Sequence, residues 1–427
     1  MEKFIINGGI PLTGELTPSG NKNAALPLLA ACLLTSEPVI LHNVPDILDV
    51  KALLKLLESL NVKIEQLSQT SYSFDSSDIR PADLDPALCR QIRASILLAG
   101  PLVSRVNELN LPPPGGDIIG RRRVDTHFLA FSRLGVTTTI VDNQFHFESK
   151  GLIGAEILLD EASVTATENA IMACVLAEGE STIRNAASEP HIQELCLFLN
   201  QLGAKINNIG SNTLQITGVK ELGGGEFTIG PDYLEVVSFI GAAVVTRGSL
   251  RIHNAGVKHL DMIQLVMDRL GVTWEIDNDD IIVPQNQDLT IKPDLGNAIP
   301  EISVMPWPAF PTDLMSIAIV IATQSKGSIL FHDWMYPSRM FFTDKLVSMG
   351  AQIVLCDPHR CIVQGPTRLS GEQLESPDIR AGMALLLAAL SAEGKSVIRN
   401  VSQIDRGYQA VDLKLKSLGA DIQRVSE

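Results

Sequence analysis

The segment Pro112–His127, PPPGGDIIGRRRVDTH, sets one acid in a glycine turn and places three consecutive arginines behind it. Asp117 directly follows the two glycines, and Arg121, Arg122 and Arg123 come shortly after it. The chain as a whole has a formal net charge of -15, so its overall electric field repels phosphate. An anion that binds here must therefore be attracted by a local cluster of positive charge, and this segment is a candidate for that cluster.

Charged and polar residues also stand where six alanine- and leucine-rich segments are expected to begin as helices. These residues are Lys22 with Asn23, Arg93, Glu168 with Asn169, Asp232 with Glu235, Asp313, and Asp378 with Arg380. The N-terminus of a helix has unpaired N–H groups and a partial positive charge, so it favours an anionic group. Arg122, Arg339 and Arg406 can add their charges to these helix ends. The pattern predicts a deep site for a phosphate-rich ligand and not a nucleic-acid-binding surface.

The sequence contains six copies of one unit. Each copy has an apolar helix, a small turn, a short strand that mostly ends in Asn or Asp, an amphipathic helix, and a closing segment similar to Leu-Gly-Ala. The closing residues give a period of roughly 70 residues and are Asn61, Gly135, Gly203, Gly271, Gly350 and Gly419. One looser copy holds the segment Pro112–His127 as an insertion. Alternating strand and helix signals place the chain in the α/β class.

The first helix of every copy is apolar almost all round, and such a helix belongs in an interior. We therefore expect a two-domain, inside-out α/β barrel with three repeat units in each domain, helices buried inside and sheets outside. One domain is expected over residues 22–230, with a mobile glycine loop at 112–123, and the second over residues 1–21 plus 231–427. FIINGG near the N-terminus is expected to pair with ADIQRV near the C-terminus. The site would lie in the cleft between the domains.

Composition excludes several other classes of protein. The six cysteines lie mostly in apolar runs without a CxxC pair, which is typical of buried thiols in a reducing compartment. The eight histidines show no metal-ligand spacing, so we expect no metal and no cofactor. No apolar stretch reaches the ~18–20 residues of a membrane span, and no signal-peptide pattern is present. We expect a soluble cytoplasmic protein without a nucleic-acid or membrane partner, and its oligomeric state stays open, a monomer included.

Several motifs carry a resemblance to one enzyme family. SGNKNAALP, PGG-x-x-IG followed by arginine and VDTH, SVTATEN, FPTDL, PDIRA and IDRGY resemble, in their order, the UDP-N-acetylglucosamine 1-carboxyvinyltransferases, which are enolpyruvyl transferases. The likeness extends from Phe4 to Val425, and SGNKNAALP and FPTD are its most specific motifs. Related enzymes that use shikimate 3-phosphate share the six-unit fold, but their N-terminal lysine lies in a different motif.

The resemblance implies a reaction and the residues that carry it. In this family phosphoenolpyruvate, a co-substrate, donates its enolpyruvyl group to the 3-hydroxyl of UDP-N-acetylglucosamine and releases phosphate, the first committed step of peptidoglycan synthesis. By resemblance, Lys22, Arg122 and Arg406 hold phosphoenolpyruvate, and Asp313 is the base that takes the hydroxyl proton. Further cations of the same basic cleft are Arg93, Arg339 and Arg380.

The other implied contacts concern mainly the sugar nucleotide. Asn23 and Asp313 would contact the sugar, Asp378 would be a second acid near the reacting centre, and Tyr336 is also expected in the substrate site. The residues matched to the diphosphate are Ser163, Val164 and Thr165. The residues matched to the stretch beside uracil are Arg123, Val124, Asp125 and Thr126.

The chain departs from the family pattern at several positions. Most members carry a cysteine at the position of Asp117, where it acts as a general acid and is alkylated by the epoxide antibiotic fosfomycin. A carboxyl group can donate a proton but is a poor target for that alkylation, so we expect an active enzyme that is insensitive to fosfomycin. The other departures lie around acceptor recognition: Arg123 replaces a proline, Tyr233 an arginine, Val236 a threonine and Met315 a glutamine.

Two alternatives stay open at this point. The chain could transfer the enolpyruvyl group to a different nucleotide or nucleotide-sugar acceptor, since the departures cluster where the acceptor is expected. It could instead be a catalytically silent paralogue that binds a sugar nucleotide, although a pure binding protein has no need of a base such as Asp313.

Overall fold

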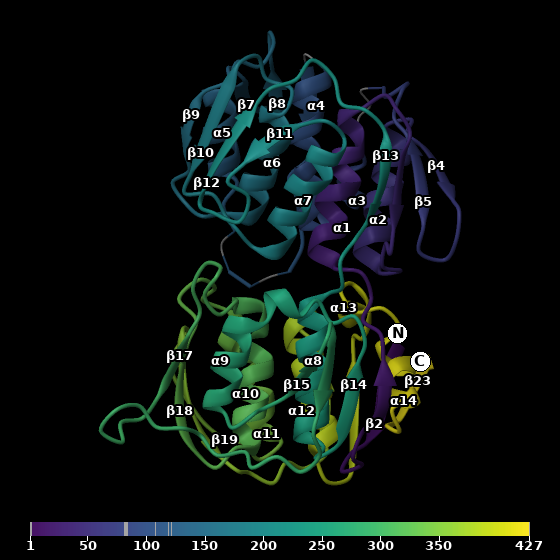
Figure 1. Ribbon diagram of the computed structural model, residues 1–427. Coiled ribbons are helices and arrows are strands. Elements are labelled where there is room, and N and C mark those ends of the chain that lie inside the picture. Colours follow the sequence, from purple (N-terminus) through teal and green to yellow (C-terminus); the bar gives the residue numbers. More distant parts are fainter. Residues whose placement is uncertain (1, 81–83, 107, 118, 121, 427) are drawn as a thin grey trace. The chain divides into compact units, whose positions relative to one another are not determined.

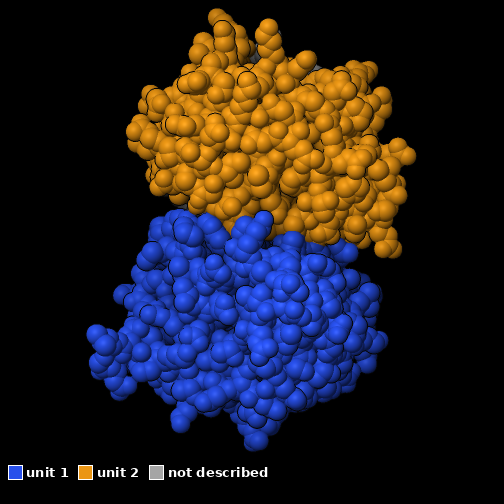
Figure 2. Space-filling model, viewed as in Figure 1, with its two compact units in different colours: residues 1–19, 118–121, 231–427 blue, residues 20–117, 122–230 orange. Residues whose placement is uncertain are grey.

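The computed structural model describes residues 2–80, 84–106, 108–117, 119–120 and 122–426. The chain divides into two compact units, shown in Figures 1 and 2. Unit 1 comprises residues 1–19, 118–121 and 231–427, and unit 2 comprises residues 20–117 and 122–230. Each unit has a hydrophobic core of its own. Arg121 lies outside the described residues.

Unit 2 alternates helices and short strands. Its helices are α1 (Lys22–Ala31), α2 (Leu48–Ser59), α3 (Pro86–Gln91), α4 (Ala99–Arg105), α5 (Asp125–Arg133), α6 (Val164–Cys174) and α7 (Pro190–Gln201), with the 3-10 turns η1 (Cys32–Leu34) and η2 (Arg93–Leu98). Its strands are β3 (Val39–His42), β4 (Lys63–Gln66), β5 (Tyr72–Asp75), β6 (Glu108–Leu111), β7 (Thr137–Val141), β8 (Gln144–Glu148), β9 (Glu156–Leu158), β10 (Glu180–Arg184), β11 (Lys205–Asn207), β12 (Thr213–Thr217) and β13 (Gly225–Thr228).

Unit 1 is built in the same way. Its helices are α8 (Tyr233–Val245), α9 (Asp261–Arg269), α10 (Met315–Gln324), α11 (Thr343–Ser348), α12 (Ile379–Ser391), α13 (Ser402–Asp405) and α14 (Val411–Ser417), with the 3-10 turns η3 (Val257–His259), η4 (Thr312–Leu314) and η5 (Arg339–Phe342). Its strands are β1 (Glu2–Asn7), β2 (Thr13–Leu16), β14 (Ser249–Ile252), β15 (Glu275–Asp277), β16 (Asp280–Val283), β17 (Glu301–Ser303), β18 (Gly327–His332), β19 (Gln352–Asp357), β20 (Arg360–Gly365), β21 (Gln373–Glu375), β22 (Lys395–Arg399) and β23 (Asp421–Ser426).

The described strands form six separate sheets, three in each unit, and five of them share one topology. In these five, an edge strand pairs in parallel with its neighbour, and two further strands follow antiparallel, as in β13-β3-β5-β4 and β17-β18-β20-β19. The sixth sheet, β6-β8-β7, is antiparallel throughout and belongs to the looser sequence copy. The α/β class with repeated units is therefore confirmed. The expected pairing of FIINGG with ADIQRV is also confirmed, because β1 runs antiparallel to β23.

The apolar helices lie inside and the sheets lie outside them. In unit 1, α8, α10 and α12 contact one another, and all thirteen residues of α8 are buried. Figure 1 shows these helices between the sheets that contain β17 and β14. In unit 2, α1, α4 and α6 form the interior, with η2 leading into α4. One expected helix start is wrong: α6 begins at Val164, a full turn before Glu168 and Asn169, which lie buried inside it.

The repeated closing residues share one backbone requirement. Each ends an amphipathic segment with a positive φ, between 66° at Asn61 and 104° at Gly203 and Gly350. Glycine, and next to it asparagine, adopts this left-handed conformation with little strain, which explains why these residue types recur at the ends of helices. The sequence signature is therefore a signature of helix termination.

Two other expectations concern membrane-spanning helices and the burial of the cysteines. In the described parts of the chain, no helix is both long and apolar enough to cross a bilayer. Five of the six cysteines are buried as expected, but Cys356 is exposed.

Replacing Leu387 by alanine should lower the free energy of unfolding of unit 1 by about 2–5 kcal/mol, because it opens a cavity between α12 and α8. The matched control is Leu413→Ala, at a side chain that is 64% exposed, with an expected change within about 0.5 kcal/mol. Urea unfolding followed by tryptophan fluorescence measures this unit, since the three tryptophans are Trp274, Trp307 and Trp334. Equal effects of the two substitutions would contradict the buried position of Leu387.

Candidate active site

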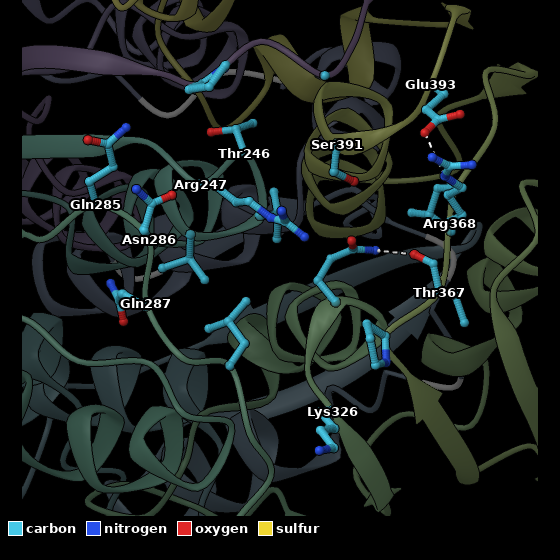
Figure 3. A pocket seen from close by; sticks show the side chains of 18 residues that line it. Thr246, Arg247, Gln285, Asn286, Gln287, Lys326, Thr367, Arg368, Ser391 and Glu393 are labelled. Carbon is cyan, nitrogen blue, oxygen red and sulfur yellow. Dashed lines mark hydrogen bonds and ion pairs between the residues drawn. The ribbon is translucent and has the colours of Figure 1, made fainter.

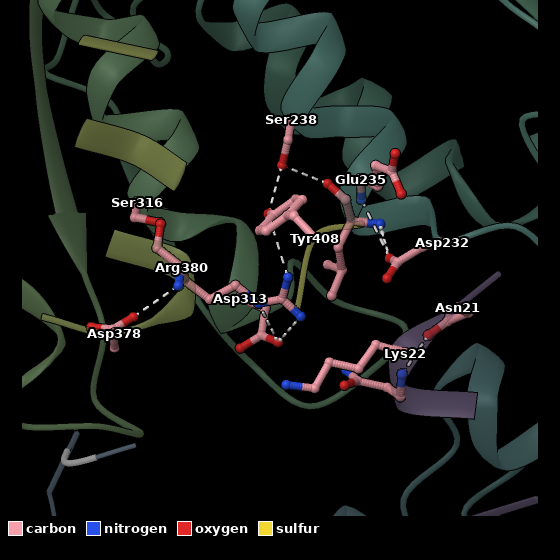
Figure 4. A network of polar contacts seen from close by, with 12 residues as sticks. Asn21, Lys22, Asp232, Glu235, Ser238, Asp313, Ser316, Asp378, Arg380 and Tyr408 are labelled. Atoms are coloured by element: carbon pink, nitrogen blue, oxygen red, sulfur yellow. Dashed lines mark hydrogen bonds and ion pairs between the residues drawn. The ribbon is translucent and has the colours of Figure 1, made fainter. Parts of the chain in front are cut away.

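In unit 1, Asp313 is held by two arginines where the buried helices begin. Asp313 lies in η4, directly before α10. Its Oδ1 accepts a hydrogen bond from Nη2 of Arg339 at 3.0 Å, and its Oδ2 accepts one from Nε of Arg380 at 3.1 Å. The two arginine side chains are only 3% and 6% exposed, whereas that of Asp313 is 28% exposed. The carboxylate is thus fixed in orientation and still accessible (Figure 4).

A second layer of contacts fixes Arg380. Its Nη1 lies 3.4 Å from the hydroxyl of Tyr408, which lies 2.9 Å from Oγ of Ser238 in α8. The guanidinium also lies over the Tyr408 ring, 5.7 Å from its centre. Burial lowers the pKa of Arg380, but the charges of Asp313 and Asp232 together with the Tyr408 hydroxyl outweigh burial, and the pKa lies above its usual value. Arg380 therefore stays charged in the interior.

Arg339 has a comparable environment. Burial lowers its pKa, and the charges of Asp313, Asp378 and Asp333 more than offset this and raise it. Its guanidinium lies 5.3 Å from the ring centre of Tyr336. The Nε atom of Arg339 is buried and has no hydrogen-bond partner among the described residues. A buried donor without an acceptor is unusual, and the oxygen of a bound water or substrate could accept a hydrogen bond from this Nε–H.

Asp378 and Arg406 occupy the ends of helices in the same unit. Oδ1 of Asp378 caps α12 by accepting hydrogen bonds from the backbone N–H groups of Arg380 and Ala381, at 2.8 and 3.0 Å. Arg406 follows α13 and donates from Nη1 to Gln403 at 3.0 Å. The structure thus gives Asp378 a capping role that the sequence reading did not assign.

In unit 2, Lys22 is the first residue of α1 and is buried. Its Nζ lies 2.7 Å from Oδ2 of Asp49 in α2, and the two side chains are 7% and 6% exposed. Asn21 caps α1 and accepts hydrogen bonds from the N–H groups of Asn23 and Ala24, at 2.8 and 3.3 Å. Lys22 and Asn23 are therefore positioned by the start of the helix, and the charge of Lys22 is balanced by Asp49.

The glycine turn before Asp117 is packed closely against the end of α3 and the start of η2. A side chain at Gly115 would meet the carbonyl oxygen of Arg90 at 1.7 Å, so only glycine fits there. Gly116 has a φ of +101°, and a Cβ on it would lie 3.0 Å from Cβ of Arg93 and 3.4 Å from Nη1 of Arg122. Asp117 itself is half-buried. The turn thus brings Asp117 into the neighbourhood of Arg93 and Arg122.

Arg123 forms the centre of a polar cluster. It contacts Asp125 through Nε at 3.0 Å and Asp160 through Nη2 at 2.9 Å, and these hydrogen bonds raise its pKa. The hydroxyl of Thr126 donates to the other oxygen of Asp160 at 2.8 Å, and this bond is the main cause of the lowered pKa of Asp160. Arg93 donates to the backbone carbonyl of Arg123 at 2.7 Å. Val124, between these residues, precedes α5.

The residues matched to the diphosphate begin α6. Ser163 is the N-cap, and its side chain makes no capping hydrogen bond. Val164 and Thr165 follow in the first turn, where backbone N–H groups have no partner within the helix. Oγ1 of Thr165 lies 3.2 Å from Nε2 of the buried His127 in α5. The start of α6 can thus bind an anion without displacing a cap.

Sequence reasoning missed the partners that hold these groups in place. Asp49 and Asp160 lie outside the motifs, Tyr408 ends IDRGY and His127 ends VDTH. Each of these four residues contacts a predicted site residue that is distant in sequence. The available signals were the last residues of these two motifs: His127 directly follows Asp125 and Thr126, and Tyr408 lies two residues after Arg406. Among the described residues, no group of three or more His, Cys, Asp or Glu side chains is arranged to hold a metal ion.

Unit 1 also contains a pocket of about 830 Å³ at the opposite ends of the buried helices (Figure 3). It is lined by residues at the C-terminal ends of α8, α10 and α12, among them Arg247, Gln324 and Ser391. None of the predicted site residues lines it.

Comparison with known proteins identifies the family of the chain. The sequence profile of the family described as EPSP synthase (3-phosphoshikimate 1-carboxyvinyltransferase) matches residues 6–415. The chain is 55% identical to the UDP-N-acetylglucosamine 1-carboxyvinyltransferase of Bradyrhizobium diazoefficiens over 100% of this chain and 98% of the relative. It is 51% identical to the protein of the same name from Treponema denticola, with 99% of each chain covered.

Solved structures show the same fold. The enolpyruvyl transferase NikO from Streptomyces tendae matches 100% of this chain and 99% of its own with a TM-score of 0.89 and 25% identity. The EPSP synthase from Acinetobacter baumannii matches all of both chains with a TM-score of 0.77 and 15% identity, which supports the fold alone.

Asp49→Ala should destabilise unit 2 by about 3–5 kcal/mol, because it leaves the buried ammonium of Lys22 without this carboxylate. The control is Asp46→Ala, which removes an ion pair with Lys51 whose side chains are 51% and 55% exposed; a loss below about 1 kcal/mol is expected. Urea unfolding followed by far-ultraviolet circular dichroism compares the two variants. Similar small losses in both would show that Lys22 is not held by a buried pair.

Proposed function

The chain belongs to the family of UDP-N-acetylglucosamine 1-carboxyvinyltransferases, and we infer that it transfers the enolpyruvyl group of phosphoenolpyruvate to the 3-hydroxyl of UDP-N-acetylglucosamine. Phosphate is released, and the product enters peptidoglycan synthesis. The observation that carries this conclusion is identity of about half of all residues over the full length of named relatives. The residue roles below are proposals supported by the geometry within each unit.

The donor carries a carboxylate and a phosphate, so its site needs several fixed cations. We assign this role to Lys22, Arg122 and Arg406, with Arg93 supporting the loop that carries Arg122. The position of Lys22 supports its role in binding the donor, because Lys22 is the first residue of α1 and the helix dipole there also favours an anion. The reaction passes through a carbon with cationic character between two anionic groups, and the fixed cations hold those two anionic groups in place without reorganisation.

Asp313 is proposed as the base that accepts the proton of the 3-hydroxyl. Its two buried arginine partners orient the carboxylate and favour its ionised form, and its partial exposure leaves an edge open to the sugar. The oxygen freed of its proton then forms a bond to C2 of the donor while C3 takes up a proton. In the second step C3 loses a proton, the double bond between C2 and C3 forms again, and the bond from C2 to the phosphate oxygen breaks. Asn23, Asp378, Arg339, Arg380 and Tyr336 are proposed to line this part of the site.

The acceptor's diphosphate is proposed to bind at Ser163, Val164 and Thr165, where the first turn of α6 has open N–H groups. The uracil is proposed to lie beside Arg123–Thr126. The ion pairs of Arg123 with Asp125 and Asp160 connect this stretch to the chain around residue 160, and we propose that it recognises the base by shape and backbone hydrogen bonds. Asp117 is proposed as the acid that protonates C3 of the donor.

The purified protein should release phosphate from phosphoenolpyruvate only when UDP-N-acetylglucosamine is present, and mass spectrometry should find the enolpyruvyl-sugar product. Asp313→Asn should lower kcat by about 10²–10⁴-fold while the sugar nucleotide still binds, because it removes the base and keeps the shape. Phosphate release with another nucleotide acceptor alone would instead favour the alternative acceptor. Binding of UDP-N-acetylglucosamine without turnover under any condition would identify a silent paralogue.

The unchanged enzyme should keep full activity after incubation with a large excess of fosfomycin, because a carboxyl group at position 117 is a poor nucleophile for the epoxide. Asp117→Cys is the matched variant, and it should lose activity progressively under the same conditions. The measurement is residual phosphate release against time of incubation. Progressive inactivation of the unchanged enzyme would refute the prediction.

A further inference from the structure

A chain of hydrogen bonds in unit 2 ends at Thr165, in the first turn of α6. The buried imidazole of His127 lies between two residues of α6: its Nδ1 is 2.8 Å from Nδ2 of Asn169, and its Nε2 is 3.2 Å from Oγ1 of Thr165. Both His127 and Asn169 are fully buried. No role is assigned to these two residues by the motifs or by the proposed reaction.

The backbone decides how Asn169 is oriented. Its Oδ1 accepts a hydrogen bond from the N–H of Gly100 at 2.8 Å, and its Nδ2 donates to the carbonyl of Ile96 at 2.9 Å. A backbone N–H can only donate and a carbonyl oxygen can only accept, so the amide cannot be turned over. The second hydrogen on Nδ2 is then directed at Nδ1 of His127.

The orientation of Asn169 in turn fixes the state of the histidine. Nδ1 of His127 must accept the hydrogen bond, so it carries no proton, and the neutral ring carries its proton on Nε2. Burial, and to a lesser extent the charge of Arg93, lowers the pKa of His127 to about 3. The ring is therefore neutral at physiological pH, and its Nε2–H donates to Oγ1 of Thr165.

The consequence concerns the hydroxyl hydrogen of Thr165. Because Oγ1 accepts from His127, its own hydrogen must point elsewhere, and no acceptor for it is found among the described residues. The Thr165 side chain is half-buried at the same helix start where the uncapped N–H groups lie. We propose that His127 and Asn169 are positioning residues that make the Thr165 hydroxyl a hydrogen-bond donor to a diphosphate oxygen of the acceptor.

This proposal rests on the proposed function for the identity of the ligand, but the hydrogen-bond chain itself does not. The chain explains how a neutral hydroxyl can add direction to a helix N-terminus, which by itself attracts an anion without fixing its orientation. It also requires Gly100, since a Cβ there would lie 2.7 Å from Oδ1 of Asn169 and push α4 and α6 apart.

The first test is the protonation state of His127 in the unliganded protein. Nuclear magnetic resonance of protein labelled with ¹⁵N in histidine should show one ring with its proton on Nε2 and no titration from about pH 5 to pH 9. His127→Phe assigns the signal by its disappearance. A proton on Nδ1, or titration in that range, overturns the proposal whatever the enzyme's substrate.

The second test is binding of ligands with and without the diphosphate. Thr165→Val removes the donor and keeps the shape, so the affinity for UDP and for UDP-N-acetylglucosamine should fall roughly 10-fold to 100-fold, as expected for one hydrogen bond to a charged group. Thr165→Ser should restore most of the affinity. Uridine, which lacks the diphosphate, should bind the unchanged protein and Thr165→Val equally, and calorimetry measures all of these.

The outcomes separate the two claims. If UDP binding is unchanged in Thr165→Val, the proposed contact is wrong even when the enzyme is active with UDP-N-acetylglucosamine. If the unchanged protein binds no uridine nucleotide, both the proposed function and the contact of Thr165 with the diphosphate are wrong. The nuclear magnetic resonance measurement on His127 then decides by itself whether the hydrogen-bond chain exists. His127→Phe should raise KM for the sugar nucleotide more than it lowers kcat, which a general loss of structure would not do.

Discussion

Helices without a polar face impose the main constraint on this fold. All thirteen residues of α8 are buried, and such a helix can present polar groups only at its ends. Its first backbone N–H groups still need partners, which Asp232 supplies for α8 and Asp378 for α12. Side chains capable of chemistry therefore gather where the helices begin, and Asp313 and Arg380 meet there because their helices pack against each other.

An acidic chain that binds anions has to hold its cations in defined pairs. Lys22 faces Asp49, Arg123 faces Asp160, and Asp313 is shared by two arginines. A buried charge without a partner is far less favourable than a paired one, so the buried cations Lys22, Arg339 and Arg380 are oriented before a substrate arrives. An anionic substrate then binds to cations that are already paired with carboxylates. Its selection therefore depends on the geometry of these cations more than on a net positive charge of the site.

Much of the architecture could be predicted from the sequence, because it follows from local rules. Asn61 and the five equivalent glycines have a left-handed backbone, and this requirement produced the repeat that revealed six units. The partners of the site residues could not be predicted, since the meeting of Arg380 with Tyr408 depends on how distant segments pack. The predicted start of α6 was wrong because polar residues were expected at the start of the helix. Glu168 and Asn169 are polar, but they lie buried within α6.

Asp313 in unit 1 and Thr165 in unit 2 are oriented by different physical means. In unit 1 the orientation of Asp313 comes from charge, and each added charge has to be balanced by another, as the raised pKa of Arg339 shows. Near the start of α6 a further cation would be repelled by Arg93, and the lowered pKa of His127 reflects both burial and this repulsion. A neutral imidazole between Asn169 and Thr165 transmits direction without adding charge. Neutral hydrogen-bond chains are therefore the means left for orienting a donor where the local field is already positive.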